Sequence, residues 1–125
     1  MQQIELPYAT LSFGEPIVDI TYKPNAQLGF IEIHELIATA QKLSGGKPYV
    51  VLSDVRMGIE VTPLGKKVVS DPAESPLHRG TAILLKSEMM VLAANFFSSF
   101  SKPPYPMKAF TDRKTATAWL LTLPL

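Results

Sequence analysis

The last third of the chain constrains the fold more strongly than any other part of the sequence. Residues 81–85 form a short apolar run of the kind found in buried strands. A mostly apolar helical stretch follows at residues 88–100, and then a proline-rich turn at 102–106. A short strand at 107–110 and a terminal helix with the only tryptophan, Trp119, complete this part. Strands that alternate with helices predict parallel pairing through right-handed crossovers, and therefore an α/β sheet.

The beginning of the chain is expected to form a β-hairpin. Residues 4–13 predict a strand, although Pro7 limits it to a sheet edge or a bulge because proline has no N–H to donate. Residues 17–22 alternate in polarity and are rich in β-branched side chains, which predicts a second strand. The turn between them makes this strand the antiparallel partner of the first.

The first helix is expected to open at Pro24 and Asn25 and to end at Gly45 and Gly46, because glycine accepts the positive φ of a helix C-terminus. His34 lies off the apolar face of this helix and is expected to be solvated. The apolar positions, which share one face, are Phe30, Ile33, Leu36, Ile37, Ala40 and Leu43.

A strand buried on both faces is predicted at residues 49–53, with a loop at its carboxyl end from 54 to 58. Thr62 is expected to be the N-cap of a short helix with Pro63 at its first position. This helix should stop near Asp71, because the following residue is a proline.

These elements predict a single-domain α/β architecture over residues 1–125. The expected sheet is mixed and five-stranded, in the element order ββαβαβαβα, with helices packed on it. A hydrophobic content of 46% is sufficient for a core and argues against disorder.

The composition excludes several classes of function. Twelve basic and eleven acidic residues give a net charge of +1, which does not favour a nucleic-acid partner. The absence of cysteine excludes disulfides and thiolate-bound zinc. The first residues show no secretory signal, and no apolar run approaches the roughly 20 residues of a spanning helix. We therefore expect a soluble cytoplasmic protein without a transmembrane segment.

Motifs for catalysis and cofactors are missing from the sequence. There is no nucleophile elbow, P-loop or dinucleotide fingerprint. His34 and His78 lack the spacing of metal ligands. The prolines at 103, 104 and 106 are expected to form a rigid connection rather than a docking motif. We expect no catalytic residue, no metal and no cofactor.

The carboxyl edge of the parallel strands is the first candidate binding region, because ligands of open α/β sheets favour that edge. Helix amino ends would also lie there, and their unpaired N–H groups attract anions. The alternative is that these polar residues only cap helices. The candidate residues are Asp54 and Arg56, Lys86 and Ser87, Thr111 and Asp112, with Thr62 at the start of the short helix.

The helix at 88–100 is the second candidate, because its apolar arc is wider than packing on a sheet requires. Met89, Met90, Phe96 and Phe97 belong to this arc. The surplus could contact a second subunit or an acyl chain, since Met-rich surfaces adapt to varied partners. The simpler interpretation is packing against neighbouring helices of the same chain.

The element order and the run NFFSSFSKPPYPMKAF at residues 95–110, leading to Trp119, resemble STAS-type proteins with the SpoIIAA-like fold. More narrowly, they resemble small stand-alone bacterial members of unknown role. The resemblance implies a mixed sheet that begins with a β-hairpin. It also implies association with proteins, as in anti-sigma factor antagonists, or with lipids and small apolar ligands.

In the antagonists, a serine at a helix start follows an aspartate and is phosphorylated to control partner binding. Thr62 stands at the comparable position, but Val61 precedes it where the aspartate should be. The sequence therefore departs from the family's phosphorylation motif at this point.

We expect a non-enzymatic STAS-like domain that binds an unidentified protein partner, homodimerisation included. The alternative function is a carrier or sensor of a lipid or another small apolar ligand. An enzyme is the third hypothesis, and it requires Asp54 to act as a base with a strongly raised pKa.

Overall fold

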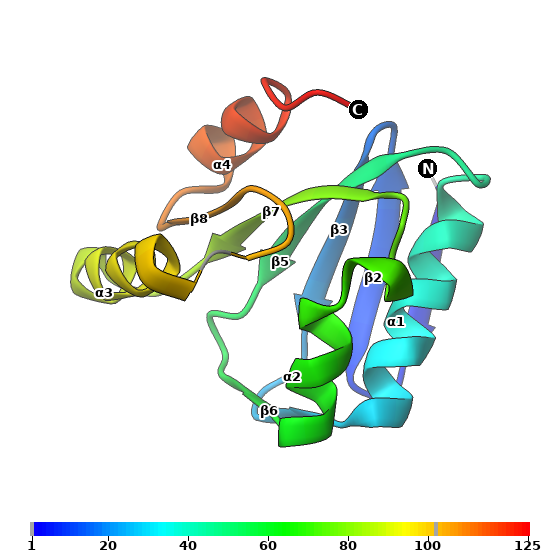
Figure 1. Ribbon diagram of the computed structural model, residues 1–125, viewed down its shortest axis with the longest axis horizontal. Coiled ribbons are helices and arrows are strands. Elements are labelled where there is room, and N and C mark those ends of the chain that lie inside the picture. The colour runs from blue at the N-terminus through cyan, green and yellow to red at the C-terminus, as the bar shows by residue number, and fades with distance from the viewer. Residues whose placement is uncertain (1, 102) are drawn as a thin grey trace.

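The computed structural model describes residues 2–101 and 103–125, and the side chains of all of these except 97–101. Its centre is a six-stranded mixed sheet with the strand order β1-β2-β3-β5-β7-β8 (Figure 1). The first three strands pair antiparallel and the last three join them in parallel. The strands are β1 (Gln2–Leu6), β2 (Ala9–Gly14), β3 (Ile17–Tyr22), β5 (Tyr49–Asp54), β7 (His78–Leu84) and β8 (Met107–Phe110).

The amino-terminal strands correct the expected hairpin to a three-stranded meander. The segment predicted as one strand at residues 4–13 is divided into β1 and β2, and Leu6 pairs with Ala9 across a tight turn at Pro7 and Tyr8. A proline interrupts the ladder because it cannot donate a hydrogen bond, so the chain reverses there. The main sheet consequently has six strands and not the five that were expected.

A second correction concerns the start of the first helix. The segment after Asn25 is a strand, β4 (Ala26–Leu28), which pairs in parallel with β6 (Ile59–Val61) in a separate two-stranded sheet. Asn25 adopts a φ of 55°, a conformation that asparagine tolerates better than most residues. The helix α1 (Phe30–Leu43) begins only at Phe30, where the Glu32 carboxylate accepts the Gly29 N–H at 2.8 Å.

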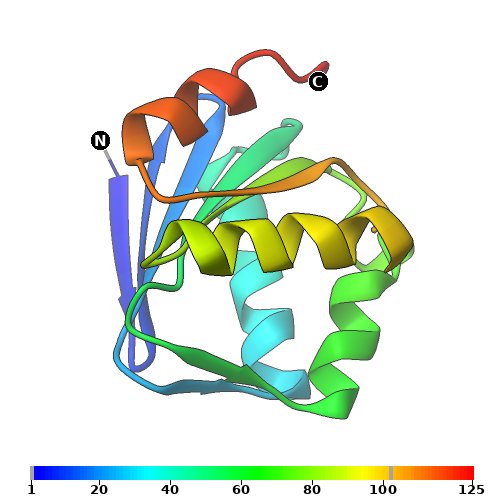
Figure 2. The ribbon, with the colours of Figure 1, turned by 90° about the vertical axis from the view of Figure 1, so that its left-hand side faces the viewer.

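The helices cover the two faces of the main sheet unequally (Figures 1 and 2). Helix α1 and helix α2 (Pro63–Ser70) pack together on one face, followed by a short 3₁₀ helix, η1 (Pro72–Glu74). Helix α4 (Arg113–Leu120) packs on the other face, mainly against β5, β7 and β8. Helix α3 (Glu88–Ser101) lies alongside β8, the last strand of the sheet.

The sheet separates two hydrophobic cores. The alternation along β5 directs Tyr49 and Val51 towards α1 and α2, and Val50 and Leu52 towards α4. The α4-side core also contains the fully buried Leu120. The fold is therefore a mixed sheet with helices packed on it, as the alternation of strands and helices predicted, and the structure places these helices on both faces.

Candidate functional site

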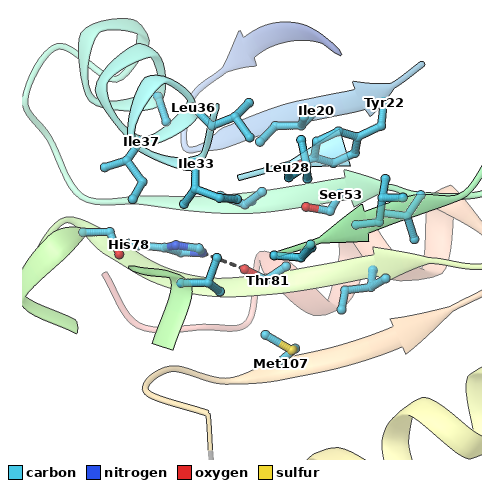
Figure 3. A pocket seen from close by; sticks show the side chains of 18 of the residues that line it. Ile20, Tyr22, Leu28, Ile33, Leu36, Ile37, Ser53, His78, Thr81 and Met107 are labelled. Atoms are coloured by element: carbon cyan, nitrogen blue, oxygen red, sulfur yellow. Dashed lines mark hydrogen bonds between the residues drawn. The ribbon is translucent and has the colours of Figure 1, made fainter. Parts of the chain in front are cut away.

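A partly open cavity of about 240 Å³ lies between the sheet and helix α1. Figure 3 shows Ile33, Leu36 and Ile37 of α1 on one side of it and strand residues on the other. The further apolar lining comes from β3, β5 and the small sheet. The apolar lining residues include Ile20, Leu28, Ile33, Leu36, Ile37, Ala40, Val51, Val55, Ile59, Val61, Val69, Ile83 and Met107.

A few uncharged polar side chains interrupt this apolar wall. The Tyr22 hydroxyl forms a hydrogen bond with Ser53, and burial raises the Tyr22 pKa. Burial also raises the pKa of Tyr49 to about 12. It raises the pKa of Tyr105 as well, although a hydrogen bond from Thr81 opposes that shift. These hydroxyls consequently stay protonated at neutral pH, and they give the wall hydrogen-bonding capacity without charge.

An irregularity in β7 brings two polar residues to the cavity together. His78 and Thr81 are three positions apart, so a regular strand would direct them to opposite faces. The pairing of β5 with β7 shifts register between Tyr49 and Val51, and both residues consequently line the cavity. In Figure 3 a hydrogen bond joins them, with 2.6 Å between His78 Nε2 and Thr81 Oγ1.

The imidazole of His78 is stacked between two tyrosines. The ring centroids lie 3.9 Å from Tyr105 and 5.5 Å from Tyr49, with interplanar angles of 23° in both cases. Burial lowers the pKa of His78 to about 4, because the cation would lose its hydration inside the stack. His78 is therefore neutral at pH 7.

A surface groove adjoins the cavity at the amino edge of the parallel strands. It is lined by five prolines together with Arg79, and it shares Ser75, His78 and Tyr105 with the cavity. The prolines are Pro72, Pro76, Pro104, Pro106 and Pro124. The Tyr105–His78 stack thus lies where the partly open cavity and the groove adjoin.

At the carboxyl edge, the structure brings Asp54 and Arg56 into contact. The guanidinium donates from Nε to Oδ1 at 2.9 Å and from Nη2 to Oδ2 at 2.6 Å, and the Asp54 side chain is buried. These bonds from Arg56 hold the pKa of Asp54 below its usual range. A catalytic base would need a raised pKa, and the enzyme hypothesis required this of Asp54. The pKa of Asp54 is lowered instead.

Two charged residues that the sequence did not single out complete this cluster. Arg113, the first residue of α4, pairs with Asp19 of β3 and lies 3.4 Å from Asp54. Burial raises the pKa of Asp19, although the charge of Arg113 opposes the shift. Two carboxylates and two guanidiniums therefore neutralise one another, as expected for a network that anchors α4 to the sheet.

The remaining candidates at the carboxyl edge lie at helix starts. The Thr62 hydroxyl accepts the Gly65 N–H at 3.1 Å, and the Ser87 hydroxyl accepts the Met90 N–H at 3.2 Å. The Asp112 carboxylate accepts from Thr115, which lowers the Asp112 pKa. Lys86 is exposed. Each of the three capping residues thus has the local role that was the alternative to ligand binding.

Helix α3 has several exposed apolar side chains, although none of its described side chains lines the cavity. Of the residues selected from its sequence, Met89, Met90 and Phe96 are exposed, and the side chain of Phe97 lies outside the described part. Leu92 of α3 is also exposed, although it was not among the residues selected from the sequence. The exposed fractions are 76% for Met89, 48% for Met90, 65% for Leu92 and 62% for Phe96.

His34, expected to be solvated, is half-exposed and connects α1 to η1. Its Nε2 lies 2.9 Å from Glu74 Oε2, and its Nδ1 lies 2.9 Å from the Phe30 carbonyl oxygen. The Phe30 carbonyl, and then the Glu74 carboxylate, raise the pKa of His34.

Over the described residues, no group of three or more metal-ligating side chains is assembled. No helix in the described part of the chain is long and apolar enough to cross a membrane.

Similarity to a solved structure identifies the fold of this chain. The structure is similar to that of an uncharacterized protein of the DUF3478 family with a SpoIIAA-like fold from Shewanella loihica PV-4. The two chains share 16% identity with a TM-score of 0.60, over 90% of this chain and 91% of the other. The expected SpoIIAA-like fold is thereby confirmed. No curated protein matches the sequence significantly. The family model for a domain of unknown function, DUF7793, matches residues 11–123, and the chain therefore belongs to that family.

Proposed function

We propose that the protein binds a small, predominantly apolar molecule in the cavity between the main sheet and α1. The observation that carries this proposal is the cavity itself, with about 240 Å³ of space and a wall made mainly of aliphatic side chains. An apolar cavity of about 150 Å³ is large enough to bind benzene. A two-ring compound or a short acyl chain is therefore a reasonable occupant.

The polar groups of the wall support binding of a specific ligand. A binding pocket typically combines an apolar lining with a few fixed polar atoms, which orient the ligand. Ser53, Thr81 and His78 provide such atoms, and their hydrogen bonds to neighbours hold them in place. The paired state of Asp54 favours binding over catalysis.

The test is native mass spectrometry after gentle purification, with a variant that fills the cavity. Ala40 is buried on α1 and lines the cavity, so Ala40→Leu should reduce the space for a ligand. Ala38→Leu is the matched control, because it adds the same side chain to an exposed position of the same helix. We expect a co-purifying small molecule in the wild type and in the control, at reduced occupancy in Ala40→Leu. Equal occupancy in all three proteins would contradict the proposal.

The second candidate function is protein association through α3, including homodimer formation. It is favoured by the exposed apolar side chains of Met89, Leu92 and Phe96 on one helix. Burying such side chains at an interface would remove apolar surface from water, which stabilises association.

Light scattering after size-exclusion chromatography measures this association directly. Leu92→Lys should lower the mass of an assembly formed through α3. Ile31→Lys is the control, since Ile31 is 74% exposed on the distant helix α1. A monomeric wild type at high concentration would reject the homodimer.

A further inference from the structure

His78 occupies the wall between the cavity and the groove, where the rings of Tyr49 and Tyr105 stack against its imidazole. His78 lines both the cavity and the groove. A molecule in the cavity can therefore approach this side chain through its ring atoms in the plane.

The protonation of the ring is fixed by a backbone carbonyl. Nε2 of His78 lies 3.0 Å from the carbonyl oxygen of Gly80, which can only accept a hydrogen bond. Nε2 must consequently carry the proton. In a neutral imidazole, Nδ1 is then an acceptor with a free lone pair.

Nδ1 is available to a ligand. The described residues provide His78 with hydrogen bonds only at Nε2. Among the described residues, no fully buried side-chain nitrogen or oxygen lacks a partner, so Nδ1 has contact with open space. Burial lowers the pKa of His78, which keeps this nitrogen in its accepting form at neutral pH.

We propose that the ligand is an uncharged apolar molecule with one hydrogen-bond donor, a hydroxyl or an N–H, which His78 Nδ1 accepts. This inference rests on the proposed function, because it specifies the chemistry of the cavity's ligand. The 20 described residues that line the cavity have uncharged side chains, and His78 is neutral. A carboxylate would lose its hydration there and would face the lone pair of Nδ1, which repels it.

The test compares three naphthalene probes by isothermal titration calorimetry at pH 7. 2-Naphthol has a donor, 2-methoxynaphthalene has the same rings without the donor, and 2-naphthoate is an anion. We expect 2-naphthol to bind about tenfold more tightly than 2-methoxynaphthalene, the value of one net hydrogen bond. 2-Naphthoate should bind most weakly of the three.

Two variants assign the effect to His78. His78→Phe keeps an aromatic ring between the tyrosines and removes the acceptor, so the tenfold preference for 2-naphthol should vanish. His34→Phe makes the same exchange at a histidine that does not line the cavity and leaves His78 intact, so the preference should persist. In the wild type, the nitrogen-15 resonance of Nδ1 should shift with 2-naphthol and not with 2-methoxynaphthalene. This readout does not depend on the folding of a variant.

Equal affinity of the wild type for 2-naphthol and 2-methoxynaphthalene would overturn the inference. Retention of the preference in His78→Phe would overturn it as well, and either result would leave the proposed function standing. Failure of every probe to bind would overturn the inference, whereas the comparison of Ala40→Leu with Ala38→Leu decides the proposed function independently.

Discussion

The stacked position of His78 should make the protein sensitive to mild acid. Burial lowers the pKa of His78 to about 4, whereas the unfolded chain has the ordinary value of about 6.5. The unfolded state therefore binds a proton at a pH where the folded state does not. Stability contributed by this group is present above pH 6.5 and is lost as the pH falls towards 4.

The two pKa values give the size of the effect. The linkage relation predicts a loss of only about 0.2 kcal/mol at pH 7 but of about 2 kcal/mol at pH 5. The full difference of two and a half pKa units corresponds to about 3 kcal/mol below pH 4. A loss of about 2 kcal/mol is a large part of the 5–15 kcal/mol that is typical of a domain.

Urea denaturation of the wild type and of His78→Phe at pH 7 and pH 5 measures this loss. All other titrating groups are common to the two proteins, so their contributions cancel when the changes in unfolding free energy are subtracted. We expect the wild type to lose about 2 kcal/mol more than the variant between the two pH values. A histidine NMR titration of the wild type should show His78 still neutral at pH 5.

The reasoning would be refuted if the wild type and His78→Phe lost the same unfolding free energy between pH 7 and pH 5. A His78 resonance that titrates near pH 6.5 would refute it independently, even if His78→Phe failed to fold. Either result would mean that the Tyr49 and Tyr105 rings do not exclude water from the imidazole.

Three further predictions follow from other contacts. The pKa of His34 is raised, so the stability that His34 contributes is fully present below pH 6.5 and is lost as the pH rises through its folded-state pKa. In urea denaturation, His34→Gln should therefore be more destabilising at pH 6 than at pH 9. Gly65→Ala should cost about 1–3 kcal/mol in chemical denaturation, because its Cβ would lie 2.7 Å from the backbone carbonyl oxygen of Leu28, whereas Gly14→Ala meets no neighbour. Leu120→Ala should cost about 2–5 kcal/mol in the same assay, since it empties a fully buried site, and Leu121→Ala, at an exposed position, should change stability by less than about 0.5 kcal/mol.

The parts of the fold that depend on local signals could be predicted from the sequence. The strand at 107–110 and the helix capped by Thr62 occur where the pattern indicated. The division at Pro7 was missed because a proline in an apolar run is compatible with an edge strand as well as with a turn. Strand β4 was missed because its three residues are stabilised by pairing with β6, more than thirty positions away.

The cavity could not be predicted, because its volume depends on how side chains from separate elements fill the space above the sheet. A partial signal existed in Ser53 and Thr81, which are polar residues within apolar strands. The position of His78 beside Thr81 in the cavity wall depends on the shifted register in β7, and a register shift leaves little trace in the sequence. The contact of Arg113 with Asp19 likewise joins residues 94 positions apart.

The separation of the two cores by the sheet has a consequence for how this family can vary. Substitutions in the α4-side core and on the cavity side have few shared neighbours, so their energetic effects should be nearly additive. The cavity lining could then be exchanged to accept a differently shaped molecule while the packing around Leu120 preserves cooperativity of folding. Under the proposed function, substitutions that change the ligand preference on one face would leave the folding stability supplied by the other face largely unchanged.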